Sequence, residues 1–152
     1  MGEMVFQGAS QVNLDAKGRM AIPTRVREPL TQGGTVRLVL TAHPDGCLLL
    51  YPAPAWEPIR AQVMSFPSLD ARFSVWKRLL VGFAEDMEPD TAGRLLISPE
   101  LREFAHITRA VMLVGQGSHF EIWDLDGWKQ QLERLRSGGN TTLPPGMENF
   151  SL

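Results

Sequence analysis

One segment of this 152-residue chain occurs twice, and the repeat constrains the fold more than any other feature of the sequence. The residues Asp, Gly, Arg, Ile, Arg and Glu recur in the same order, first within residues 15–28 and again within residues 90–103, each 75 positions further along. No gap interrupts the match. Two copies, rather than a long array, predict one supersecondary unit that is duplicated and folded against itself.

A second match follows each copy. The spacing of Tyr51 and Trp56 recurs in Trp123 and Trp128, at an offset of 72 residues. Each aromatic pair lies where a hairpin is expected to lead into a helix, so the duplicated unit extends well beyond the first motif.

Each copy is expected to fold as a strand, a short helix and a hairpin, with a further strand before the turn of the first copy. Asp15–Gly18 predicts a turn between two strands, because Asp can bond its own backbone and Gly accepts positive φ without strain. Pro-Asp-Gly at 44–46 and the Gly-rich run at 115–118 predict hairpin turns. The elements expected in the first copy are strands at 12–14, 19–22, 35–41 and 46–51 and a helix at 23–30. Those expected in the second copy are strands at 94–97, 111–114 and 119–123 and a helix at 99–106.

Helices are also expected after each copy. Residues 56–64 and 69–84 predict a helical pair that is interrupted at Phe66-Pro67-Ser68. Apolar side chains in the second helix fall three and four positions apart, which predicts either buried core or a subunit contact: Phe73, Trp76, Leu80 and Phe83. Asp126 is expected to cap a final helix that ends near Arg136.

These patterns predict a domain organisation with two repeats in one chain. Gly-Gly and Pro-Pro pairs with little periodicity predict that the C-terminal tail is disordered. The expected parts are a first repeat at 4–53, a helical pair at 54–84, a second repeat at 85–123, a C-terminal helix at 124–136 and the tail at 137–152.

The composition is that of a soluble globular protein. Hydrophobic residues make up 43% and charged residues 21% of the chain, so a packed core is expected. The single cysteine, Cys47, suits a reducing cytoplasm, and neither a signal peptide nor a membrane span is evident. The net charge of −2 argues against a uniformly basic nucleic-acid binder, but it leaves room for a local basic patch.

The two copies differ in charge. Residues 15–28 carry four basic and two acidic side chains, whereas residues 90–103 carry two basic and three acidic ones. The run Lys17-Gly18-Arg19 suits DNA, because Gly allows close approach, Arg can reach a base edge or phosphate with two donors, and Lys acts as a mobile point charge. A solvated basic turn is the alternative. If one copy meets phosphate, we expect it to be the first.

Nothing in the sequence requires an enzyme. The histidines are scattered, and His43 with Cys47 lacks a second pair at metal-ligand spacing. No phosphate-binding loop, dinucleotide fingerprint or nucleophile elbow is present. We therefore expect no catalytic residue, no metal, no cofactor and no small-molecule substrate.

The motifs closely resemble those of the MraZ family of bacterial transcriptional regulators, from about residue 4 to residue 136. The segments that carry the resemblance are Phe6–Ser10, Asn13–Arg19, Pro23–Arg25, Arg27-Glu28, Asp90–Ile97 and Val111–Gln116.

The resemblance implies an AbrB-like or MazE-like swapped-hairpin β-barrel, mainly β with peripheral helices, in which the two repeats of one chain supply the two halves with pseudo-twofold symmetry. It also implies a cytoplasmic, nucleoid-associated regulator without a membrane partner. Such a regulator binds direct repeats in double-stranded promoter DNA of its own division and cell-wall gene cluster, as a ring-shaped homo-oligomer. Repression of that promoter is the expected effect.

The DNA-contacting motif of the family falls on Asp15, Lys17, Gly18 and Arg19 in this sequence. Arg19 is expected to be the principal contact and Lys17 to assist it, while Asp15 and Gly18 hold the turn. Arg25, near the start of the helix, is a secondary phosphate candidate. The second copy departs from the motif because Ala92 stands in place of Lys, which leaves Arg94 as a weaker candidate.

Two other classes of function remain as alternatives. A MazE-like antitoxin shares the barrel but would normally add a disordered toxin-binding tail, whereas the tail here is only about 15 residues. A structural ring-forming protein that does not bind DNA is the second alternative.

Overall fold

The computed structural model describes residues 5–31, 37–138 and 142–152. The first residue of the expected first repeat, the beginning of the strand predicted at 35–41 and positions 139–141 of the predicted tail lie outside the described residues.

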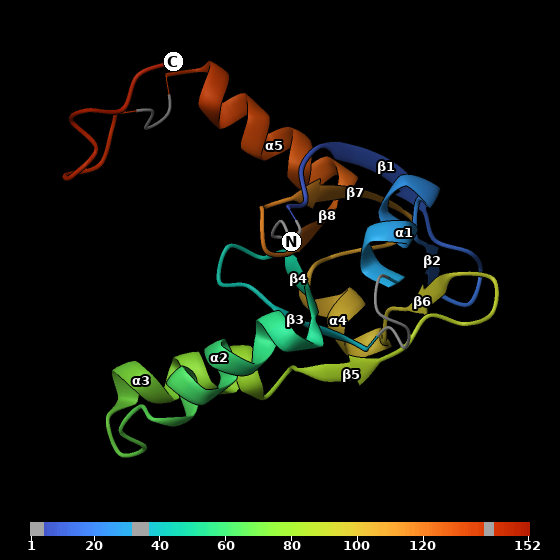
Figure 1. Cartoon of the computed structure of the whole chain (residues 1–152), viewed down its shortest axis with the longest axis horizontal. Coiled ribbons are helices and arrows are strands. Elements are labelled where there is room, and N and C mark those ends of the chain that lie inside the picture. The colour runs from blue at the N-terminus through green and yellow to red at the C-terminus, as the bar shows by residue number, and fades with distance from the viewer. Residues whose placement is uncertain (1–4, 32–36, 139–141) are drawn as a thin grey trace.

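The two halves of the chain contain the same elements in the same order (Figure 1). The first half consists of β1 (Ala9–Asn13), β2 (Arg19–Ala21), α1 (Thr24–Thr31), β3 (Leu38–Ala42), β4 (Leu48–Pro52) and α2 (Ala53–Met64). The second half consists of β5 (Glu85–Met87), β6 (Arg94–Leu96), α4 (Pro99–Phe104), β7 (Ala110–Gly115), β8 (Phe120–Asp124) and α5 (Leu125–Arg136). A helical segment, α3 (Ala71–Trp76) followed by the π-helical turn η1 (Lys77–Val81), lies between them in the sequence.

The strand pairing exchanges elements between the two copies. A six-stranded antiparallel sheet has the order β1-β7-β8-β4-β3-β5, and β2 pairs with β6 in a separate two-stranded ribbon. If each strand is exchanged for its counterpart in the other copy, the same order is obtained, read from the opposite edge of the sheet. The sheet therefore has pseudo-twofold symmetry. The first strand of each copy pairs with the hairpin of the other, β1 with β7 and β5 with β3. The predicted fold class, a mainly β swapped-hairpin fold built from two repeats, is confirmed.

One hydrophobic core belongs to both copies. Met20 and Leu95 are opposite each other in the ribbon, and both side chains are almost fully buried. Val26 from α1 and Leu101 from α4 pack into the same cluster, together with inward-facing residues of the large sheet. Because burial of apolar surface is the main favourable term in folding, the shared core stabilises each copy through the other.

The helical pair differs from its prediction in two respects. Helix α2 begins at Ala53, three residues early, because Pro is tolerated in a first helical turn. The predicted helix at 69–84 is divided into α3 and the π-helical turn, where the buried Thr41 hydroxyl donates to the Leu80 carbonyl oxygen at 2.7 Å. Trp76, one residue of the predicted apolar stripe, is 43% exposed and does not belong to the core of the described chain.

The predicted cap of the last helix was wrong. The side chain of Asp124, not Asp126, accepts the hydrogen bond from the Gly127 N–H at 3.3 Å. The reason is that β8 runs directly into α5, so the residue at the junction takes the N-cap position and Asp126 falls within the first turn.

The last described segment, residues 142–152, contains no helix or strand and is exposed. None of the helices in the described part of the chain has the length and apolar character needed to cross a membrane.

Candidate nucleic-acid interface

The first-copy turn is held by the carboxylate of Asp15. One carboxylate oxygen accepts the backbone N–H groups of Lys17 at 3.0 Å and Arg19 at 2.9 Å. The other accepts the Arg19 Nε–H at 2.7 Å. Gly18 has φ +86°, a conformation that side chains rarely adopt, so the turn requires glycine.

The second-copy turn repeats this geometry. Asp90 accepts the N–H groups of Ala92 at 3.0 Å and Arg94 at 2.9 Å, and the Arg94 Nε–H at 2.9 Å. Gly93 has φ +76°. The repeated Asp, Gly and Arg therefore specify the same local structure twice.

The β2–β6 ribbon brings the two turns together. The Ile22 N–H donates to the Gly93 carbonyl at 2.9 Å, and the Ile97 N–H donates to the Gly18 carbonyl at 3.0 Å. As a result, Arg94 Nη1 lies 3.9 Å from the Asp15 carboxylate. Because Met20 and Leu95 point into the core, the alternating residues face outward: Arg19, Ala21, Arg94 and Leu96.

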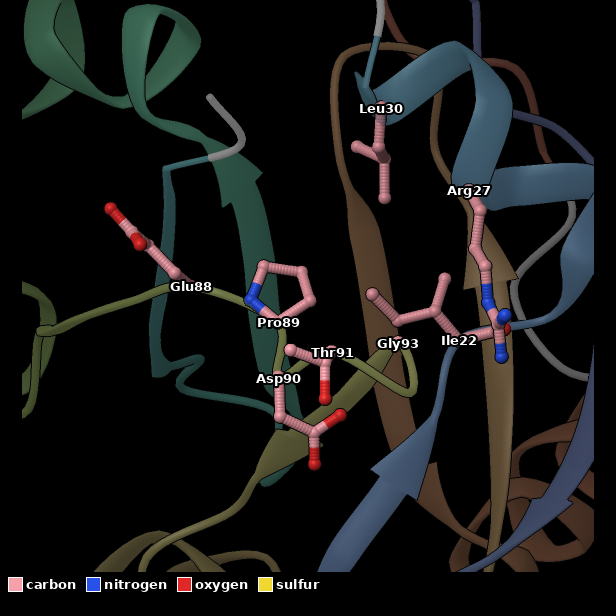
Figure 2. A pocket seen from close by; sticks show the side chains of 8 residues that line it. All are labelled: Ile22, Arg27, Leu30, Glu88, Pro89, Asp90, Thr91 and Gly93. Atoms are coloured by element: carbon pink, nitrogen blue, oxygen red, sulfur yellow. The ribbon is translucent and has the colours of Figure 1, made fainter. Parts of the chain in front are cut away.

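One arginine from each helix bonds a carbonyl of its own copy and packs against the glycine of the other copy's turn. Arg27 of α1 donates through Nε to the Ile22 carbonyl at 2.8 Å, and Arg102 of α4 donates to the Ile97 carbonyl at 3.0 Å. A Cβ atom on Gly18 would lie 2.7 Å from Arg102 Cζ, and one on Gly93 would lie 2.6 Å from Arg27 Cζ. Figure 2 shows Arg27 descending from α1 beside Gly93. The two glycines are thus needed for close packing as well as for backbone conformation.

The carboxylates of both turns are ionised at neutral pH. The backbone N–H of Arg19, with its side chain and the Lys17 N–H, lowers the pKa of Asp15 from 3.8 to about 2. The corresponding bonds from Arg94 and Ala92 lower the pKa of Asp90. Each carboxylate is occupied by groups of its own turn, so its role in the fold is to shape the turn and orient an arginine.

The structure brings five of the six predicted site residues together. Asp15, Lys17, Gly18 and Arg19 form the first turn, with Lys17 exposed, and Arg94 lies beside them. Arg25 is directed elsewhere: its guanidinium bonds the Ser10 hydroxyl and, at 3.4 Å, the Gln7 carbonyl. It therefore lies near the start of β1 rather than at the turn.

The sequence reasoning did not identify three residues of this neighbourhood. Leu96, opposite Arg19 in the ribbon, is 54% exposed. The alternation of β6 could have indicated it. Thr108 and Arg109 lie close to Asp15 across a cavity, although they precede β7 and belong to no motif. Only the tertiary fold places these two residues beside the turn.

Comparisons with known proteins agree with this architecture. A family model described as "MraZ protein, putative antitoxin-like" matches residues 5–77 and 80–144. A protein of Methylobacillus flagellatus named "Transcriptional regulator MraZ" is 55% identical over 148 residues, which cover 97% of this chain and 100% of that protein. Proteins of the same name from Dechloromonas aromatica and Nitrosomonas europaea are 54% and 43% identical, with the same coverage of each chain.

Proposed function

Because this chain belongs to the MraZ family, we propose that it is a sequence-specific DNA-binding transcriptional regulator and not an enzyme. The observation that carries the proposal is the paired turn. Two turns with the pattern Asp-x-x-Gly-Arg lie side by side on one ribbon. Lys17 is exposed, and Arg19 and Arg94 are partly exposed. The name of the relatives, which match 97% of this chain over their whole length, supports the same function.

Arg19 is the principal contact in this proposal. Its Nε is bound to Asp15, which fixes the side chain, and a pre-oriented guanidinium loses less entropy when it binds a base edge or phosphate. Lys17 adds a mobile charge, and Arg94 adds a second guanidinium from the other copy. Arg25 serves as a secondary phosphate contact near the beginning of β1.

The finer proposal concerns the target and the assembly. We place this protein in the cytoplasm, associated with the nucleoid, where it represses the promoter of its own division and cell-wall gene cluster by binding direct repeats as a ring. A ring of identical subunits presents the same turn repeatedly, so weak single contacts gain avidity on repeated DNA. This accounts for DNA binding by a subunit with net charge −2.

An apolar surface on the helical pair supports self-association. A cavity of about 370 Å³ between α2 and the α3–η1 segment is lined mostly by apolar side chains, among them Ile59, Phe73 and Trp76. Met64 and Val75 nearby are also more than half exposed. Contiguous exposed apolar patches commonly mark sites of protein association.

The experiment that tests the proposed function is a fluorescence-anisotropy titration against the upstream DNA of the gene and a scrambled duplex, across a salt series. Preference for the upstream duplex that persists near physiological salt supports the regulator. Equal binding to both duplexes that disappears as salt rises would indicate only non-specific attraction to a basic turn. Absence of binding to either duplex at low salt would favour a structural ring-forming protein.

Arg19→Ala should weaken binding to the upstream duplex by about 1–3 kcal/mol for each subunit contact if Arg19 reads a base. Arg136→Ala is the matched control, because it removes the same charge from the distant end of α5 (Figure 1). A folded Arg19→Ala protein with wild-type affinity for the upstream duplex would contradict the assignment.

An antitoxin is the second candidate, because the matching family model is described as antitoxin-like. In this chain a complete second repeat follows the first, where a MazE-type protein would carry its toxin-binding segment. A toxin gene beside this gene, and a stable complex of the two products in size-exclusion chromatography, would favour the antitoxin.

A further inference from the structure

A cavity of about 380 Å³ lies beside the first turn, and residues from both copies line it. Its walls are Leu14, Asp15 and Ala16 on one side and Arg102, Thr108 and Arg109 on the other. The backbone fixes this arrangement, since the Leu14 N–H donates to the Arg109 carbonyl at 2.8 Å and Asn13 pairs with Ala110 in the β1–β7 ladder.

Of the charged side chains that line this cavity, Arg109 is the one available to bind an anion. Asp15 is occupied by Arg19 and two backbone N–H groups, and Arg102 is anchored to the Ile97 carbonyl. Arg109 is exposed, and within the described parts of the chain no ion pair or side-chain hydrogen bond engages it. Its charge is therefore available to an anion that approaches the turn.

The equivalent cavity beside the second turn has the opposite charge. It has a volume of about 320 Å³, and Arg27, at the position of Arg102, is its one basic side chain among the described residues. Glu88 and Asp90 line it as well (Figure 2). The cavity at the first turn is thus lined by two basic side chains and one acidic side chain, whereas the cavity at the second turn is lined by one basic and two acidic side chains.

We propose that the cavity beside the first turn is a binding site for a phosphate of the DNA backbone, with Arg109 as its principal donor and the Thr108 hydroxyl as a second. This rests on the proposed DNA-binding function and extends it to residues that no motif contains. Lys17 and Arg109 then contact the backbone from two sides of one turn, while Arg19 stays on the ribbon face. Because phosphate contacts position a protein without reading sequence, Arg109 contributes equally to every duplex.

The test is the salt dependence of binding of the full chain to its upstream duplex and to a scrambled duplex, measured by fluorescence anisotropy. The binding constant K falls as salt rises, and each lost phosphate contact reduces the magnitude of the negative slope of log K against log salt by about 0.9. Arg109→Ala should therefore make this slope less negative by about 0.9 for each bound subunit, and it should weaken binding to both duplexes by the same factor. Arg109→Lys should keep the slope, because it keeps the charge.

Arg136→Ala, with the same change in net charge at the end of α5, should behave as the wild type. A wild-type slope for Arg109→Ala would overturn this inference alone. A loss confined to the upstream duplex would also overturn it, because Arg109 would then read a base. Failure of the wild-type protein to bind any duplex at low salt would overturn the proposed function and this inference with it. Thermal unfolding of each variant verifies that it is folded.

Discussion

At the scale of single residues, the turn depends on a carboxylate that is bonded to its own backbone. Asp15 and Asp90 each accept two N–H groups and an arginine, and both carboxyls are thereby easier to ionise than in the unfolded chain. The same bonds that shape the turn also fix the arginine that we propose to contact DNA. Stability and binding geometry therefore depend on the same atoms.

This predicts a pH dependence of stability. Because folding lowers the pKa of Asp15 to about 2, its contribution is fully present above the unfolded value of 3.8 and is lost as pH falls toward 2. Asp15→Asn removes the titrating group, so the unfolding temperature of this variant should fall less steeply than that of the wild type between about pH 5 and pH 2, the range in which the Asp15 carboxyl of the wild type takes up its proton. Calorimetry across this range measures the difference. Parallel curves of unfolding temperature against pH for the two proteins would refute a contribution of the ionised Asp15 carboxylate to stability.

At the scale of elements, the strands of the two copies are equivalent, but the last helix of each copy has different neighbours. Helices α2 and α5 are equivalent, and at the offset of 72 residues Val63 corresponds to Leu135. Val63 is 4% exposed because η1 packs on α2, whereas Leu135 is 54% exposed. One inserted helical segment thus makes a nearly symmetric fold unequal at its two ends.

The N-cap of α5 gives a prediction at this scale. Asp124→Ala removes the side-chain acceptor for the Gly127 N–H and should lower the free energy of unfolding by about 1 kcal/mol. Asp126→Ala, the matched control two residues later, removes only a charge near the helix dipole and should cost about 0.3 kcal/mol. Urea unfolding followed by circular dichroism measures both values. Equal losses, or a larger loss for Asp126→Ala, would contradict the cap seen in the structure.

At the scale of the whole molecule, the two kinds of surface are separated. The paired turns lie at the β2–β6 ribbon, and the helical pair projects from the opposite end of the molecule (Figure 1). With the proposed association surface at one end and the basic turn at the other, several subunits could assemble without covering their proposed DNA contacts. This arrangement suits a ring that presents one face to DNA.

Trp76→Glu should disrupt that assembly. The side chain is 43% exposed beside the apolar cavity of the helical pair, so a charge there weakens self-association without damaging the core. Light scattering after size-exclusion chromatography should show a smaller particle, and affinity should fall for a duplex with several repeats but not for one with a single repeat. Val5→Glu, at an exposed apolar position before β1, is the control. An unchanged particle mass for Trp76→Glu would exclude this surface from the interface.

Much of this protein was determined by its local sequence. The repeated Asp, Gly and Arg specify both turns, since the bonds that form them join residues at most four positions apart. The offsets between copies likewise predicted a duplicated unit, and the charge difference between the turns follows from composition.

The tertiary structure decided what depends on residues far apart in the chain. Strand β5 has only three residues, and its pairing with β3 in the other copy left no local pattern to identify. The division of the predicted helix at 69–84 coincides with a bond from Thr41, about 40 positions away, and Asp124 became the cap because β8 and α5 share a boundary. Arg109 reaches the first turn only because β1 pairs with β7. Hydrophobic periodicity and turn hydrogen bonds are local properties of the sequence. Strand pairing, side-chain burial and the lining of a cavity depend instead on which distant segments the fold brings together.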